Sequence, residues 1–182
     1  MWRRLTAETY LESEETNRPQ ELAYGVLREP AAPSFDHQVI VGRLHVRLDA
    51  HVRRQQAGRV VTSPVDVVLD RQRALIVQPD VLFVATGRLH ICTDRVWGPP
   101  DLVVEVLSTA NRRHDRSVKS GWYRAYGVRE CWIVDPVART IEIVDMSPDG
   151  DGPALFDEEQ LVQSRVLPGL QLRPLDIFSD RS

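Results

Sequence analysis

The chain has 182 residues, 42% hydrophobic and 27% charged, so we expect residues 1–182 to form one ordinary globular domain. No apolar run approaches the roughly 18 residues of a membrane span, and polar sequence follows the start where a signal peptide would be apolar, so we expect a cytoplasmic protein. The formal net charge of -3 argues against a protein that coats nucleic acid nonspecifically, but it leaves room for a local phosphate-binding patch.

The first part of the chain predicts a strand with a turn, followed by a long helix. Residues 21–27 are expected to form the strand, which turns at Gly25. Ser34 is placed to cap a helix that runs to about Gln56, in which apolar residues recur every four positions, at Ile40, Leu44 and Leu48. His37 lies one turn into this helix. It is either a polar residue of a helix start or a group that points into a cleft and contacts phosphate.

The rest of the chain predicts several strands and one more helix. The expected strands span residues 59–63, 65–69, 74–77 together with 81–84, 102–107, 131–134 and 140–144. Pro79 interrupts the third of these, which suits an edge, a bulge or the start of a strand. A helix over about 115–126 connects two apolar strands, and such a crossover favours parallel pairing. We therefore expect an α/β fold in which two helices flank a mixed sheet.

One acidic residue lies inside the most apolar strand. Burial of the Glu105 carboxylate is costly unless a metal ion, a cation or a hydrogen-bond network compensates it. Asp80 lies one loop earlier in the chain, and Lys119 lies on the following helix. We therefore expect a site for Mg²⁺- or Mn²⁺-assisted cleavage of a phosphodiester, formed by the two carboxylates, the backbone carbonyl of Val106 and the lysine. The alternatives are a turn residue for Asp80, a buried salt bridge to an arginine for Glu105 and a solvated helix face for Lys119.

Further residues are candidates for binding rather than chemistry. Arg112, Arg113 and Arg116 make the start of the second helix basic, so they either contact phosphates or form a solvated face. Glu21 is a candidate third carboxylate, or a partner of an arginine. The aromatic residues are expected in the core or at interfaces rather than stacked on bases. They are Trp97, Trp122, Tyr123, Tyr126 and Trp132.

Motifs along most of the chain resemble one family. They include Val77-Gln-Pro-Asp80, Gly98-Pro-Pro-Asp-Leu-Val-Val-Glu105-Val-Leu-Ser108, Lys119-x-x-x-Tyr123-x-x-x-Gly127, Glu130-x-Trp132-Ile-Val-Asp135-Pro and Leu167-Pro-Gly-Leu170. This combination resembles the Uma-type restriction endonuclease family of the PD-(D/E)XK nuclease superfamily.

The resemblance implies a restriction-endonuclease-like fold, with Asp80 and Glu105 as metal ligands. The superfamily lysine normally follows the second acid by two residues, where this chain has Leu107, so the resemblance implies that Lys119 takes this role. A second departure lies at Tyr24 and Val26, where the family usually has acids. The expected function is a Mg²⁺- or Mn²⁺-dependent DNA endonuclease, active as a homodimer. The alternative is a catalytically inactive nucleic-acid-binding or interaction protein of the same fold.

Overall fold

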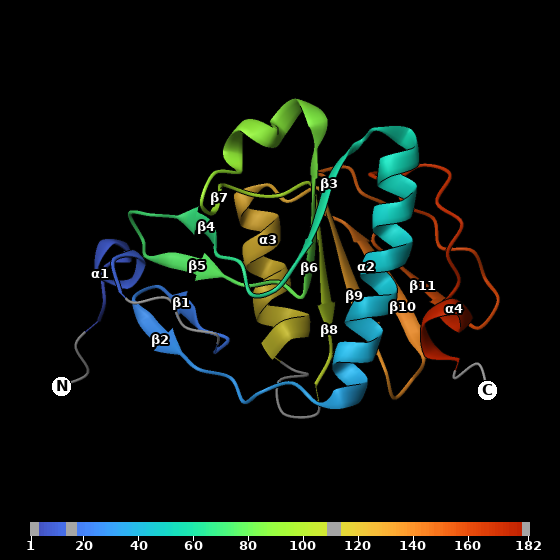
Figure 1. Ribbon diagram of the computed structural model, residues 1–182, viewed down its shortest axis with the longest axis horizontal. Coiled ribbons are helices and arrows are strands. Elements are labelled where there is room, and N and C mark those ends of the chain that lie inside the picture. The colour runs from blue at the N-terminus through green and yellow to red at the C-terminus, as the bar shows by residue number, and fades with distance from the viewer. Residues whose placement is uncertain (1–3, 14–17, 109–113, 180–182) are drawn as a thin grey trace.

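The computed structural model describes residues 4–13, 18–108 and 114–179, and its strands form two sheets (Figure 1). The six-stranded sheet has the order β11-β10-β9-β8-β6-β3. Its strands are β3 (Gly58–Thr62), β6 (Val81–Ala85), β8 (Leu102–Val106), β9 (Glu130–Asp135), β10 (Thr140–Asp145) and β11 (Pro153–Asp157). Only β8 and β9 pair in parallel in this sheet, as the predicted crossover requires. The mixed character of the sheet is therefore confirmed.

The five-stranded sheet has the order β2-β1-β5-β4-β7 and packs against the short helix α1 (Ala7–Leu11). Its strands are β1 (Glu21–Ala23), β2 (Val26–Arg28), β4 (Val67–Asp70), β5 (Leu75–Val77) and β7 (Val96–Trp97). The short 3₁₀ helix η1 (Thr86–Ile91) precedes β7. Tyr24 and Gly25 form the turn between β1 and β2, as expected for this segment.

The expectation of a single interrupted strand around Pro79 was wrong. Residues before Pro79 form β5, which pairs with β4 and β1, whereas residues after it form β6, which pairs with β3 and β8. Proline has no backbone N–H to donate to a ladder, so the chain leaves one sheet at this residue and enters the other. The segment Gln78–Asp80 is consequently the point where the two sheets meet.

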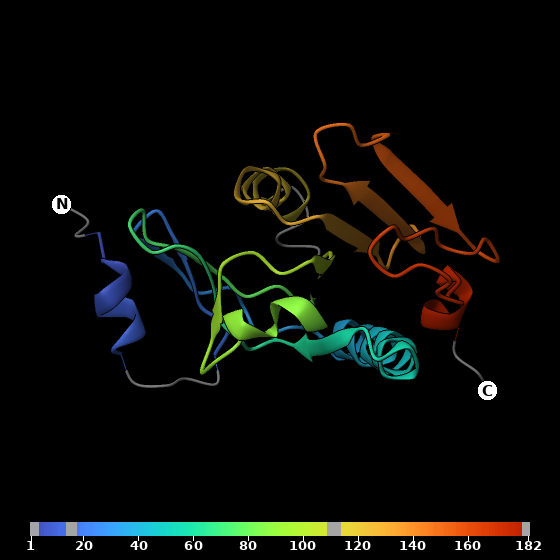
Figure 2. The same ribbon diagram turned by 90° about the horizontal axis from the view of Figure 1, so that it is seen from above.

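Two helices cover opposite faces of the six-stranded sheet (Figure 2). Helix α2 (Phe35–Gln55) packs on the face that carries Val104 and Val106, while helix α3 (Ser120–Tyr126) packs on the face that carries Val103 and Leu107. Successive side chains of a strand point to opposite faces. Glu105 therefore faces α3, because it has the same alternation as Val103 and Leu107.

Local sequence explains where the two helices begin and end. The Ser34 side chain caps α2 by accepting a hydrogen bond from the His37 backbone N–H at 3.2 Å. Helix α3 continues from the π-helical segment η2 (His114–Lys119) and ends at Gly127, whose φ of 88° suits glycine. A last short helix, α4 (Pro174–Phe178), packs beside α2. None of the helices in the described part of the chain is long and apolar enough to cross a membrane.

Candidate active site

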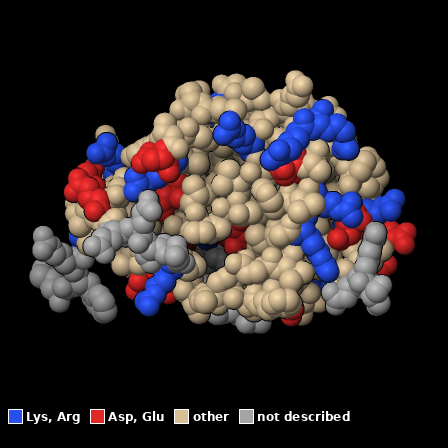
Figure 3. Space-filling model, in the orientation of Figure 1, with Lys and Arg blue, Asp and Glu red and all other residues tan. Residues whose placement is uncertain are grey.

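Asp80 and Val106 meet at one edge of the six-stranded sheet. Since β6 and β8 are antiparallel, the residue before β6 and the last residue of β8 lie side by side. The Asp80 Oδ2 atom accepts a hydrogen bond from the Val106 backbone N–H at 2.7 Å, which extends the ladder between the two strands by a side chain. The surface is hollowed over this end of β6 and β8, with acidic atoms in its floor (Figure 3). Asp80 is thus fixed beside the end of the strand that carries Glu105.

His37 reaches this edge from the first turn of α2. Its Nε2 atom lies 3.2 Å from the Val106 carbonyl oxygen and 3.4 Å from Asp80 Oδ2. A carbonyl oxygen only accepts, so Nε2 carries a proton and donates. Burial disfavours the imidazolium, but the Asp80 carboxylate and the Val106 carbonyl outweigh this effect, so the pKa of His37 is raised. The His37 side chain thus points from the start of α2 toward Asp80 and the end of β8.

Glu105 and Lys119 form a buried ion pair on the opposite face of β8. Both residues are 3% exposed, and Lys119 Nζ lies 2.7 Å from Glu105 Oε1. Lys119 Nζ also lies 2.8 Å from Glu21 Oε1 at the start of β1. Lys119 therefore lies between two carboxylates and not on a solvated helix face, the alternative considered from the sequence.

Tyr123 is the fourth member of this buried cluster. It follows Lys119 by one helical turn, and its hydroxyl donates to Glu105 Oε1 at 2.5 Å. Burial, followed by the charge of Glu105, raises the pKa of Tyr123 well above its ordinary value. The phenol consequently stays protonated and remains a hydrogen-bond donor. Glu105 Oε1 thus receives both an ammonium and a phenol, an arrangement that stabilises the ionised carboxylate.

Position 119 differs from the other lysine and arginine positions of the chain in the type of cation that it carries. Lys119 is the only lysine of the chain, which has 22 arginines. An ammonium group is a compact point charge, whereas a guanidinium group is larger, planar and permanently charged. A chain that uses arginine at every other cationic position has an amine at the buried position between Glu21 and Glu105. A compact ammonium group, rather than a planar guanidinium group, therefore lies between Glu21 and Glu105.

The structure describes only part of the remaining residues that were predicted for the site. Arg112 and Arg113 lie outside the described residues. Arg116 falls in η2, but its side chain is likewise outside the description. Glu21 is buried, and its Oε1 atom accepts a hydrogen bond from the Gln78 backbone N–H at 3.0 Å in addition to its contact with Lys119. The structure thus brings Glu21 together with Lys119 and Glu105.

The donors present are of the kind that a hard divalent cation prefers. Asp80 Oδ2 and the Val106 carbonyl oxygen already face one common point, which the His37 N–H occupies. Carboxylate and carbonyl oxygens suit Mg²⁺ or Mn²⁺. Glu105 is directed toward Lys119 and Tyr123. Among the described residues, no three His, Cys, Asp or Glu side chains gather closely enough to form a ready metal site. The donor types fit a divalent cation, and a complete ligand set requires Glu105 to turn toward Asp80.

Two residues near the acids were not singled out from the sequence. Tyr123 was assigned to the core, although its spacing of four residues from Lys119 places both side chains on one helix face. That spacing was a usable signal. Gln78 contacts Glu21 through its backbone, and its sequence position two residues before Asp80 carries no comparable signal.

Comparisons with known proteins agree with this architecture. The model of the Uma2 family, described as "Putative restriction endonuclease", matches residues 7–176. The chain also resembles the crystal structure of "a putative nuclease belonging to DUF820" from Anabaena variabilis ATCC 29413, with a TM-score of 0.80 and 19% sequence identity over 96% of this chain and 97% of that one. At this identity the likeness concerns the fold, and it confirms the expected α/β architecture. No curated protein matches the chain. Since the family model covers nearly the whole sequence, the chain belongs to the Uma2 family.

Proposed function

We propose that this protein is a metal-dependent endonuclease that hydrolyses phosphodiester bonds of DNA. One observation carries the proposal: in a chain of the Uma2 family, Asp80 is bound to Val106 at the end of β8, the strand that also carries Glu105 in its buried pair with Lys119. Two acids on neighbouring strands with a buried amine beside them supply charges of both signs at one edge of the sheet. Such an arrangement suits a reaction in which a phosphate gains negative charge.

Asp80, Glu105 and the Val106 carbonyl would hold Mg²⁺ or Mn²⁺. When bound, such an ion lowers the pKa of a water molecule and neutralises charge on the phosphate. Lys119 is held between Glu21 and Glu105, and its ammonium would stabilise the oxyanion that develops at the scissile phosphate. Glu21 is the additional carboxylate of the site. We assign substrate binding to His37, through its Nε2–H, and to Arg112, Arg113 and Arg116.

A second function keeps the fold without catalysis: an inactive nucleic-acid-binding or interaction protein. The observation that favours it is the mutual engagement of Lys119 and Glu105, each 3% exposed. In this arrangement neither group faces solvent. The turn at Tyr24 also lacks the acid that the family usually has there. An active enzyme therefore requires Glu105 to leave part of its contact with Lys119 when metal and substrate bind.

Cleavage of supercoiled plasmid by purified protein distinguishes the two functions. The wild type is incubated with Mg²⁺, with Mn²⁺ or with EDTA, beside Asp80→Asn, Glu105→Gln and Lys119→Met. We expect metal-dependent nicking that falls by about 100-fold or more in each variant, because each removes charge at the reacting phosphate. Glu159→Gln, a charge-neutralising change at an exposed position far along the chain, serves as the matched control and is expected to cleave normally.

Each outcome has a defined meaning. Cleavage that persists in Asp80→Asn and Glu105→Gln comes from a contaminant or from another site, and it refutes the roles assigned here. Absence of cleavage with a folded wild type, together with retained DNA binding in a gel-shift assay, supports the inactive binding protein.

We also propose that the active form is a homodimer, because cutting both strands of a duplex in one encounter requires two sites. Sedimentation velocity measures the mass of the protein in solution. The order in which nicked and linear plasmid appear reports whether the two strands are cut together. A monomer that only nicks refutes this part of the proposal and leaves the assignment of the site intact.

A further inference from the structure

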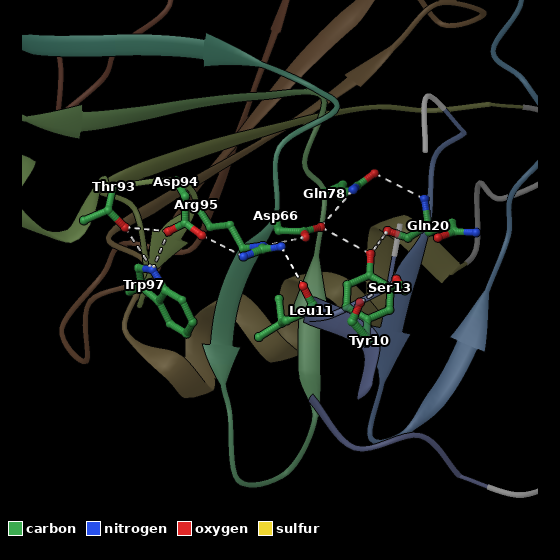
Figure 4. A network of polar contacts seen from close by, with 10 residues as sticks. All are labelled: Tyr10, Leu11, Ser13, Gln20, Asp66, Gln78, Thr93, Asp94, Arg95 and Trp97. Atoms are coloured by element: carbon green, nitrogen blue, oxygen red, sulfur yellow. Dashed lines mark hydrogen bonds and ion pairs between the residues drawn. The ribbon is translucent and has the colours of Figure 1, made fainter. Parts of the chain in front are cut away.

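A network of hydrogen bonds in the five-stranded sheet is centred on Asp66, just before β4 (Figure 4). Asp66 Oδ1 accepts from Gln78 Nε2 at 2.9 Å and lies 3.2 Å from the Tyr10 hydroxyl. Asp66 Oδ2 accepts from Arg95 Nε at 3.3 Å. An ionised carboxylate only accepts hydrogen bonds, so Asp66 fixes the Gln78 amide with its NH₂ group toward Asp66 and its carbonyl away from it.

The other end of the Gln78 amide is bound to the start of β1. Gln78 Oε1 accepts from the Gln20 backbone N–H at 3.2 Å, and the Gln78 backbone N–H donates to Glu21 Oε1 at 3.0 Å. Strands β1 and β5 pair through Leu22 with Ile76 and through Ala23 with Leu75. Gln78 therefore extends this pairing beyond the end of both strands, toward the edge where Glu21 lies.

Glu21 connects this network to Lys119, because it contacts both Gln78 and Lys119. The same oxygen, Oε1, accepts from the Gln78 backbone and lies 2.8 Å from Lys119 Nζ. Lys119 has a long, flexible side chain, and holding its ammonium in one place costs conformational entropy. With Glu21 fixed on one side and Glu105 on the other, the ammonium has two anchors. A shift of Glu21 would remove one of them.

We propose that Gln78 and Asp66 are positioning residues: by fixing Glu21, they hold the Lys119 ammonium group between Glu21 and Glu105. Their effect on cleavage rests on the proposed nuclease function, whereas their effect on Lys119 does not. If Gln78 and Asp66 served only the fold, their substitution would lower the free energy of unfolding without changing the surroundings of Lys119 in the folded protein. The two roles are therefore separable by observing Lys119 directly.

The composition of the chain provides the probe. Lys119 is the only lysine, so protein labelled with ¹³C,¹⁵N-lysine gives a single side-chain nitrogen signal, that of Lys119 Nζ, in an NMR spectrum. Gln78→Glu places a carboxylate against Asp66. The double variant Asp66→Asn with Gln78→Glu exchanges amide and carboxylate, so that one donor and one acceptor face each other again.

We expect Gln78→Glu to shift the Lys119 signal and to lower kcat roughly tenfold or more with KM changed less than about twofold. We expect the double variant to restore both.

Thr93→Val is the matched control, because it changes the outer end of the network, where Thr93 contacts Asp94 and Trp97. It is expected to leave the Lys119 signal and kcat unchanged. A Lys119 signal that stays at its wild-type position in folded Gln78→Glu overturns the proposal. If Gln78→Glu does not fold, the same measurement on Gln78→Met decides. Absence of cleavage by the wild type refutes the nuclease function alone, since the Lys119 signal still tests the positioning role.

Discussion

Replacement of Tyr123 by phenylalanine isolates one hydrogen bond of the buried cluster. The Tyr123 ring is fully buried, and phenylalanine retains it, so Tyr123→Phe leaves almost no cavity and removes only the hydroxyl that donates to Glu105 Oε1 at 2.5 Å. A hydrogen bond to an ionised, buried partner contributes roughly 1.5–3 kcal/mol. Glu105 keeps its contact with Lys119. We therefore expect the free energy of unfolding to fall by about 2 kcal/mol, which corresponds to a Tm lower by roughly 4–8 °C.

Helix α3 offers a matched control for this experiment. The Tyr126 hydroxyl donates to Asp70 Oδ2 at 3.0 Å, in a partly exposed setting, and the pKa of Tyr126 is raised to about 12 by burial and by Asp70. Tyr126→Phe should cost about 0.5–1.5 kcal/mol, because water compensates a partly exposed carboxylate. Urea denaturation measures both variants, and an unchanged m-value indicates an unchanged unfolded state.

The comparison refutes the reasoning if Tyr123→Phe loses no more stability than Tyr126→Phe. That result would mean that Glu105 is neutral in the folded protein, or that its bond to Tyr123 is weak. The difference between the two variants should also stay constant between about pH 6 and pH 9. Both phenols have pKa values raised above the ordinary value and stay protonated throughout this range.

Three further outcomes follow from buried or strained positions. Lys119→Met leaves two buried carboxylates without their shared ammonium, so urea denaturation at pH 7 should show a loss of about 3–5 kcal/mol. Burial lowers the pKa of His51 below its ordinary 6.5, so the unfolded chain takes up the proton first. The free energy of unfolding should therefore decline as the pH falls below about 6.5, and His51→Gln should lack this part of the decline. At Gly58 (φ 155°) an added Cβ would lie 2.1 Å from the Val84 carbonyl oxygen, so Gly58→Ala should lower the Tm clearly, whereas Gly42→Ala, in an open helical position, should stabilise by about 0.5–1 kcal/mol.

Helices and strands whose formation depends on neighbouring residues in the chain were predictable from the sequence. The four-residue spacing of Ile40, Leu44 and Leu48 predicts the buried stripe of α2, and all three side chains are buried. The apolar segment around Glu105 predicts a central strand, and β8 lies between β6 and β9. These features depend on the periodicity and capping of neighbouring residues, which a sequence displays directly.

The arrangement of the sheets was only partly predictable. Pro79 showed that a ladder ends near this residue, but the sequence does not distinguish an interrupted strand from a passage between two sheets. Which strands β5 and β6 join depends on partners such as β1 and β3, which lie far away in the chain. Pairing of this kind is decided by packing over the whole domain.

For the candidate site, the sequence by itself determined the kinds of residue and the tertiary structure decided their relations. An acid in an apolar strand had to have a compensating partner, and the basic helix that follows supplied the only lysine of the chain. The pairing of Lys119 with both Glu21 and Glu105, the donation from Tyr123 and the direction of His37 toward Asp80 became visible only in three dimensions. The physical reason is that desolvation and charge pairing depend on distances of a few ångströms between groups that lie tens of residues apart in the chain.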